Sequence, residues 1–187
     1  MKKRIFIIFA CILALGLLLP ARGAVPVVGA TQQDWHEQSF WFSLWGKSGV
    51  HKGIDIFAPK GTRVISSDYG LVVYAGNIDM GGNVVAVLGP KWRIYYYAHL
   101  QNINTNTWDM AGKGDIIGSV GDSGNAKGKP PHLHYSVLSL APYPWRFTLG
   151  ALLAKHKTGR KYLWWIHQKC LVPVKNLHHY LNALQAA

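Results

Sequence analysis

Acidic side chains are scarce in this chain. Of its 187 residues, 8 are Asp or Glu and 20 are Lys or Arg, which gives a formal net charge of +12. No acidic residue follows Asp122, so the C-terminal third is basic or neutral. A surface of this kind attracts polyanions, such as nucleic acid, anionic lipid or an anionic wall polymer.

Glutamate is almost absent, since Glu37 is the only one. The sequence therefore has no His-Glu-x-x-His helix, in which a glutamate serves as the base beside zinc. This excludes the common glutamate-dependent zinc peptidases. In any hydrolytic site of this chain a histidine has to move the proton, which suits imidazole near neutral pH.

Cysteine is rare as well, with one residue at Cys11 and one at Cys170. Cys11 lies inside an apolar run and does not follow a small-residue acylation site, so we expect no lipoprotein attachment. If that run is removed, Cys170 stands alone and no intramolecular disulfide can form. A closed structural zinc site, which normally uses four protein ligands and more cysteine, is also not expected.

The N-terminus has the parts of a secretory signal peptide. A basic start, Met1-Lys2-Lys3-Arg4, precedes an unbroken apolar run of 15 residues from Ile5 to Leu19. Small residues stand at −3 and −1 if cleavage follows Gly23. We expect residues 1–23 to be a signal peptide and the protein to be periplasmic or secreted, which argues against nucleic acid as a partner. The run is short for a membrane span, so an uncleaved anchor is the weaker alternative.

Short runs rich in β-branched and aromatic residues predict strands at 63–65, 71–75, 83–88, 93–97 and 132–138. Turn-forming residues separate them, and we interpret the glycines of 112–125 as tight turns because no phosphate-loop Lys-Ser/Thr ending is present. Regular short strands with glycine turns predict a mostly antiparallel sheet or sandwich. The aromatic residues of 24–45 predict an N-terminal segment that wraps over the core.

The last part of the chain differs in composition, and we interpret residues 141–170 as an insertion. Short helices are expected at 149–156 and 177–184, so the C-terminal extension is partly helical. Four cations flank an apolar group at 163–166, an arrangement common at membrane surfaces; they are Lys155, Lys157, Arg160 and Lys161. They predict contact with an anionic polymer or membrane, although a solvated loop over a packed strand is the simpler interpretation.

Two pairs of residues carry the chemistry: His51 with Asp55, and His132 with His134. Residues at even separations share one face of a strand, so both pairs can face one groove. They supply two imidazoles and one carboxylate for a metal, with a further imidazole beside it. Three protein ligands and one open position are typical of catalytic zinc. His99, at the end of an aromatic strand, is a candidate acid or base next to the metal.

The remaining histidines predict packing or surface roles only; they are His36, His156, His167, His178 and His179.

Several motifs, taken in order along the chain, resemble the lysostaphin-type peptidoglycan endopeptidases, also called LytM-like zinc peptidases. They are His51-Lys52-Gly53-Ile54-Asp55-Ile56, Ala58-Pro59-Lys60-Gly61-Thr62, Gly70-Leu71-Val72-Val73-Tyr74-Ala75-Gly76, Gly82-Asn83-Val84-Val85, Tyr97-Ala98-His99-Leu100, Gly114-Asp115-Ile116-Ile117-Gly118 and His132-Leu133-His134-Tyr135. The resemblance covers about residues 44–138, and faintly 171–181. It departs from the family at 44–47, at 88–92, which lacks the usual His-Gly, and at 141–170.

The resemblance implies that His51, Asp55 and His134 bind Zn²⁺. It implies that His132 and His99 line the catalytic centre, one as general base and the other steadying the oxyanion. The expected fold is a small antiparallel β domain of the lysostaphin-like, duplicated hybrid motif type, in one domain over residues 24–187 with its core at about 44–140.

The implied activity is hydrolysis of the peptide cross-links between peptidoglycan peptide stems. Two alternatives are a non-catalytic LytM-like activator of a wall amidase and a secreted bacteriolytic factor. The complete set of metal ligands argues against the non-catalytic activator. The lack of a separate wall-binding domain argues against the bacteriolytic factor.

Overall fold

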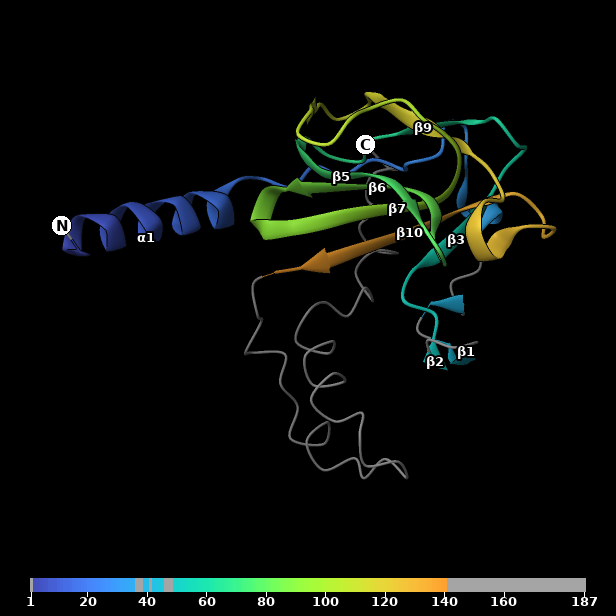
Figure 1. Ribbon diagram of the computed structural model, residues 1–187, viewed down its shortest axis with the longest axis horizontal. Coiled ribbons are helices and arrows are strands. Elements are labelled where there is room, and N and C mark those ends of the chain that lie inside the picture. Colours follow the sequence, from blue (N-terminus) through green and yellow to red (C-terminus); the bar gives the residue numbers. More distant parts are fainter. Residues whose placement is uncertain (1, 36–38, 41, 46–48, 141–187) are drawn as a thin grey trace.

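The computed structural model describes residues 2–35, 39–40, 42–45 and 49–140 (Figure 1). The helices predicted at 149–156 and 177–184, the apolar group at 163–166 and the four cations near it lie outside these residues.

The described chain is a mostly antiparallel β domain, as predicted from the resemblance. Its main sheet has eight strands. The order along the sheet is β3 (Ile54–Phe57), β10 (His132–Ser139), β7 (Arg93–Ile103), β6 (Gly82–Gly89), β5 (Gly70–Ile78) and β8 (Met110–Ala111). Off this path, β9 (Ile116–Val120) pairs with β7 and with β4 (Arg63–Ile65). The five predicted strands are confirmed as β4, β5, β6, β7 and β10.

Smaller elements complete the described part of the chain. A two-stranded sheet pairs β1 (Ser43–Trp45) with β2 (Gly49–Val50). Three short 3-10 helices are η1 (Gln32–Asp34), η4 (Pro90–Trp92) and η5 (Gly124–Ala126). The predicted turn in the glycine-rich segment is present between β8 and β9. Gly114 has a φ of +93° there, which residues other than glycine rarely adopt.

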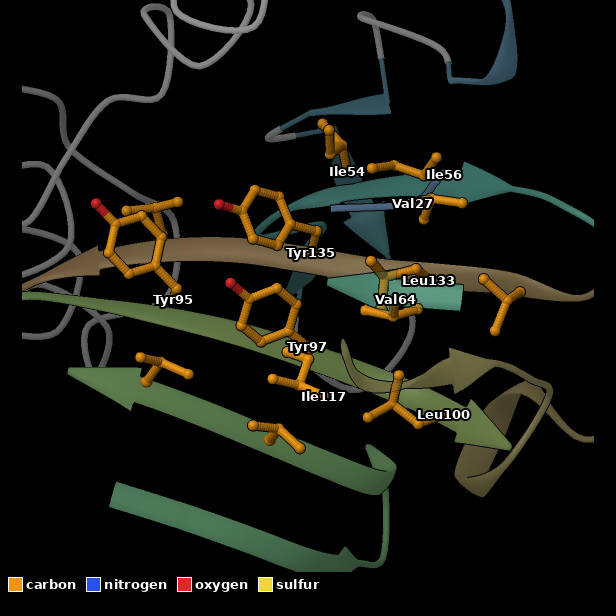
Figure 2. Packing of buried hydrophobic residues seen from close by; sticks show 14 of the residues in the cluster. Val27, Ile54, Ile56, Val64, Tyr95, Tyr97, Leu100, Ile117, Leu133 and Tyr135 are labelled. Carbon is orange, nitrogen blue, oxygen red and sulfur yellow. The ribbon is translucent and has the colours of Figure 1, made fainter. Parts of the chain in front are cut away.

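The core lies on one face of the main sheet. Alternate residues of β7 and β10, among them Tyr95, Tyr97 and Tyr135, point to this face and are buried (Figure 2). The rings of Tyr97 and Tyr135 have centroids 5.3 Å apart, and the hydroxyl of Ser67 lies 2.6 Å from both phenolic oxygens. Burial raises the pKa of Tyr97 to about 12. A small polar network is thus enclosed within the apolar core.

The N-terminal part contributes one projecting helix and one packed segment. Helix α1 (Lys2–Leu18) has no buried residue and points away from the sheet (Figure 1). None of the helices that the structure describes is both long and apolar enough to cross a membrane. Further along, Val27 pairs with Val64 of β4, and Trp35 is 4% exposed. The predicted N-terminal wrap is confirmed at these residues, whereas Phe42 is 54% exposed.

Strand β10 lies between β3 and β7, and its register brings distant segments together. His134 is opposite Asp55 of β3 on one side and Ala98 of β7 on the other. Because neighbouring side chains on a strand point to opposite faces, His134 lies on the face away from Tyr135 and the core. This outer face carries the candidate site.

Candidate metal centre

Three side-chain atoms converge on one point of the outer face. Oδ1 of Asp55 lies 2.8 Å from Nδ1 of His134 and 3.0 Å from Nε2 of His51, and the two nitrogens are 3.1 Å apart. Ligands at the corners of a tetrahedron with bonds of about 2.0–2.1 Å are about 3.3 Å apart. The three atoms are slightly closer together than this, so a small outward shift would bring them to the tetrahedral spacing. The two imidazoles and the carboxylate are therefore arranged to hold one cation.

The backbone brings His51 to this point by a turn and not by a strand. Asp55 lies on β3, but residues 51–53 precede that strand. The expectation that His51 and Asp55 share one strand face is therefore wrong, because β3 begins at Ile54. Gly53 allows the turn: a Cβ there would lie 2.5 Å from the carbonyl oxygen of Tyr135 and from Oγ of Ser136.

Hydrogen bonds on the far side of each ring orient the two imidazoles. Nδ1 of His51 lies 2.9 Å from the carbonyl oxygen of Ser39, to which it donates. Nε2 of His134 lies 3.3 Å from Oγ of Ser136, which in turn donates to the carbonyl of Lys52 at 2.6 Å. With those ring nitrogens protonated, Nε2 of His51 and Nδ1 of His134 carry the lone pairs that can bind a cation. Ser136 shares a strand face with His134, so its spacing of two could have indicated it in the sequence.

Electrostatics at the cluster also favour a cation. Burial alone would raise the pKa of Asp55, but its close contacts with the imidazoles of His134 and His51 lower it overall. Burial likewise opposes charge on His51, yet the hydrogen bond and the charge of Asp55 raise its pKa. The carboxylate is therefore ionised, and its negative charge stabilises positive charge where the three atoms meet.

Two further imidazoles, His132 and His99, stand beside the cluster. Nε2 of His132 is 3.9 Å from Oδ2 of Asp55, while its Nδ1 donates to the carbonyl of Pro130 at 2.8 Å. The His99 ring has its centroid 5.1 Å from that of His132 and 5.9 Å from that of His134. Burial, followed by the nearby His134 and His132, lowers the pKa of His99 to about 4. His99 is thus neutral near neutral pH, with one ring nitrogen that carries no proton.

His99 reaches the site through an irregularity in β7. Leu100 pairs with Asn83 of β6, and Tyr97 pairs with Val85. The pairing therefore advances by three residues on β7 but by two on β6, so β7 contains one extra residue here. Such a bulge changes which side chains point to which face. His99 adopts a left-handed φ of +64° and faces the site, while Leu100 is fully buried in the core. Without the extra residue, His99 would continue the buried series of Tyr95 and Tyr97.

Side chains of Asn83 and Ser123 hold this irregular backbone. Nδ2 of Asn83 donates to the carbonyls of Leu100 and Gln101, both at 3.1 Å. Oγ of Ser123 donates to the carbonyl of Leu100 at 2.8 Å and accepts the backbone N–H of Asn83 at 2.9 Å. The carbonyl of Ser123 accepts a hydrogen bond from Nδ1 of His99 at 3.0 Å, so Nε2 of His99 is the ring nitrogen that can face the reactants. Neither residue was a predicted site residue.

The structure therefore brings together all five residues that the resemblance implied: His51, Asp55, His99, His132 and His134. A model of peptidase family M23 matches residues 49–142, a range that contains all of them. The chain belongs to peptidase family M23. This family is zinc-dependent, in keeping with a donor set of two imidazoles and one carboxylate.

Two of the relatives are endopeptidases by name, and one of these names specifies peptidoglycan. The chain is 35% identical over 128 residues to the L-Ala–D-Glu endopeptidase of Bacillus subtilis (strain 168), a match covering 59% of this chain and 39% of that protein. It is 33% identical over 93 residues to the peptidoglycan DD-endopeptidase ShyC of Vibrio cholerae, covering 50% and 21% respectively. The chain thus spans less than two fifths of the length of either relative.

Among solved M23 structures, the catalytic domain of lysostaphin from Staphylococcus simulans has a similar fold. The TM-score is 0.52 at 27% sequence identity, over 60% of this chain and 88% of that domain. The lysostaphin-like fold class expected from the sequence is therefore confirmed.

Proposed function

We propose that this chain is an exported zinc metalloendopeptidase that hydrolyses peptide cross-links of bacterial peptidoglycan. The observation that carries the proposal is the convergence of His51, Asp55 and His134 within hydrogen-bonding distance, with two more imidazoles beside them. Membership of family M23 and the peptidoglycan endopeptidases among the relatives support it.

The three converging residues would hold Zn²⁺ as two nitrogen ligands and one carboxylate oxygen. Zinc commonly binds these ligand types, and three protein ligands leave a position for water or substrate. When bound, zinc supplies a Lewis acid that polarises the scissile carbonyl and makes water more acidic. The hydrogen bonds from His51 to Ser39 and from His134 to Ser136 keep the ligand nitrogens free of protons.

His132 and His99 would handle the proton. In each, Nδ1 is held by a backbone carbonyl, so Nε2 is the nitrogen that exchanges a proton with the reactants. One imidazole would accept the proton of the attacking water at Nε2. The other, carrying a proton on Nε2 as well as on Nδ1, would donate a hydrogen bond to the oxyanion as the carbonyl becomes tetrahedral. The arrangement explains how hydrolysis proceeds in a chain whose only glutamate is Glu37.

Digestion of purified sacculi tests the activity. We expect the zinc-loaded protein to convert cross-linked muropeptide dimers into monomers, identified by mass, and His132→Ala and chelator-treated protein to leave the dimers intact. Cleavage within the stem, as the name of the Bacillus subtilis relative implies for that protein, would place the same chemistry on a different bond. Failure of the zinc-loaded protein to release any muropeptide would contradict the proposal. It would then favour a non-catalytic activator of a wall amidase.

Export and surface binding are proposed from the sequence. The basic, apolar start of the chain would direct it to the periplasm or out of the cell. Lys155, Lys157, Arg160 and Lys161 would hold it near anionic polymer or lipid. Replacing these four residues by Ser should weaken salt-sensitive binding to sacculi or anionic vesicles and leave cleavage of a small soluble cross-linked peptide unchanged. Unchanged binding at low salt would show that the segment has no such role.

A further inference from the structure

Asp68, on the core side of the sheet and away from the metal centre, is a fully buried carboxylate without a cationic partner among the described residues. Its exposed fraction is 0%. Oδ2 accepts hydrogen bonds from the Tyr95 hydroxyl at 3.1 Å and from the backbone N–H of Arg22 at 2.9 Å, and Oδ1 accepts from the backbone N–H of Tyr69 at 3.0 Å. In the described part of the chain, no Lys, Arg or His nitrogen lies within 4.0 Å of it. Buried carboxylates are normally paired with a positive charge.

Arg22 lies at the boundary between the projecting helix α1 and the packed domain. No residue of α1 is buried, and the Arg22 side chain is exposed. The next residue, Gly23, is buried, and the backbone N–H of Ile65 donates to Pro26 at 2.8 Å. The carbonyl of Arg22 accepts a hydrogen bond from Nζ of Lys113 at 2.9 Å, so this residue is held on both sides.

We propose that the peptide bond between Ala21 and Arg22 is a processing site, and that the new α-ammonium group of Arg22 is the counter-ion of Asp68. A leader peptidase would hydrolyse this bond with one water molecule, which leaves a carboxylate on Ala21 and an ammonium on Arg22. The Arg22 nitrogen already lies 2.9 Å from Oδ2 of Asp68, so the ion pair forms without rearrangement of the domain. Residues 1–21 leave with α1.

The sequence alone favours cleavage after Gly23, since Leu19 stands at the −3 position of the Ala21 site, where a small residue is preferred. The structure favours Ala21. Cleavage after Gly23 would remove the Arg22 nitrogen, so Asp68 would lose one of its three hydrogen-bond donors. Ala21 itself is the small residue that position −1 requires.

The mass of the exported protein tests this directly. The full chain, expressed in a bacterial host and recovered after export, should begin at Arg22 by intact mass and N-terminal sequencing. A protein that begins at Ala24, at any other residue, or at Met1 would overturn the proposal. The inference rests on the proposed export, but this readout requires neither a variant nor peptidase activity, so its failure is distinguishable from failure of the proposed hydrolysis.

A second measurement tests the ion pair. A chain made to begin at Arg22 is compared with one that carries a single extra Gly before Arg22, which moves the ammonium away from Asp68. The extension should lower Tm by about 5 °C or more, and it should change Tm by less than about 1 °C when Asp68 is replaced by Asn. Asp115→Asn is the matched control, because its exposed carboxylate accepts the Gly112 N–H and should leave the effect of the extension intact. An equal effect of the extension with and without the Asp68→Asn substitution would overturn the ion pair.

Discussion

The hydroxyl oxygen of Ser136 lies 3.3 Å from Nε2 of His134, on the side of the imidazole opposite to Asp55. Because this hydroxyl gives its own proton to the carbonyl of Lys52, it can only accept a hydrogen bond from His134. Ser136 therefore keeps the proton of His134 on Nε2 and frees Nδ1 for the metal.

Ser136→Ala should lower zinc affinity about 10–100-fold, since loss of the partner behind a ligating histidine has effects of that size. Competition with a chromophoric chelator measures the affinity. Ser119→Ala is a suitable control, because the buried Ser119 hydroxyl has no hydrogen-bond partner among the described residues. An affinity equal to that of the unaltered chain in both variants would show that Ser136 does not orient His134.

Removal of a proposed ligand should abolish zinc binding. We expect one zinc per chain by metal analysis after reconstitution, and none at comparable affinity in His134→Ala or Asp55→Ala, which each lose one of the three converging atoms. Asp109→Ala, in an exposed turn, should retain the metal. Unchanged zinc in His134→Ala would refute the assigned ligand set.

His132 should be separable from the ligands. Its Nε2 is 3.9 Å from Oδ2 of Asp55, outside the three closely spaced atoms, so His132→Ala should keep zinc and lose at least about 100-fold in kcat. Zinc content and muropeptide release from the same preparation give both readouts. If His132→Ala loses zinc and His134→Ala keeps it, the two roles are reversed.

The histidine pair on β10 could be predicted to share a face from its spacing, because His132 and His134 are two apart in a regular strand. His51 could not be placed this way, since it reaches the cluster through a turn that depends on Gly53. His99 was harder still: strand alternation puts it in the core beside Tyr97, and only an extra residue in β7 reverses this. The resemblance supplied His99, whereas the hydrogen bonds of Asn83 that hold it depend on tertiary contacts that no local pattern encodes.

Asn83 should act as a positioning residue for His99. Asn83→Ala removes the hydrogen bonds to the carbonyls of Leu100 and Gln101, so the left-handed backbone at His99 loses support. We expect kcat to fall about 10-fold or more with KM and zinc content unchanged, because a small misplacement of a catalytic group costs rate more than binding. Asn77→Ala is the control: the Asn77 side chain donates to the side-chain oxygen of Asn83, and its loss should have a small effect. Loss of zinc in Asn83→Ala would point to a general structural role.

Alkaline pH should destabilise the fold through its buried tyrosines. The pKa of Tyr97 is raised to about 12 by burial, compared with about 10 in an unfolded chain. Between these values only the unfolded chain loses the proton, so stability is complete below about pH 10 and falls as the pH rises toward 12. Urea unfolding across this range should show a smaller loss in Tyr97→Phe than in the unaltered chain. If stability falls with pH at the same slope in Tyr97→Phe and in the unaltered chain, Tyr97 is not a source of the alkaline destabilisation. Tyr74→Phe, at an exposed position, is the control and should change this slope little.

The place of β10 in the sheet also determines when the metal centre can exist. β10 is the last strand of the described chain, yet it inserts between β3 and β7, which are made much earlier. A chain emerging from the ribosome or threading through a translocation channel carries His51 and Asp55 long before His134, which follows Asp55 by 79 positions. Such a nascent chain has an incomplete donor set. The three converging atoms can therefore meet only when the sheet closes around β10, the last strand of the described chain.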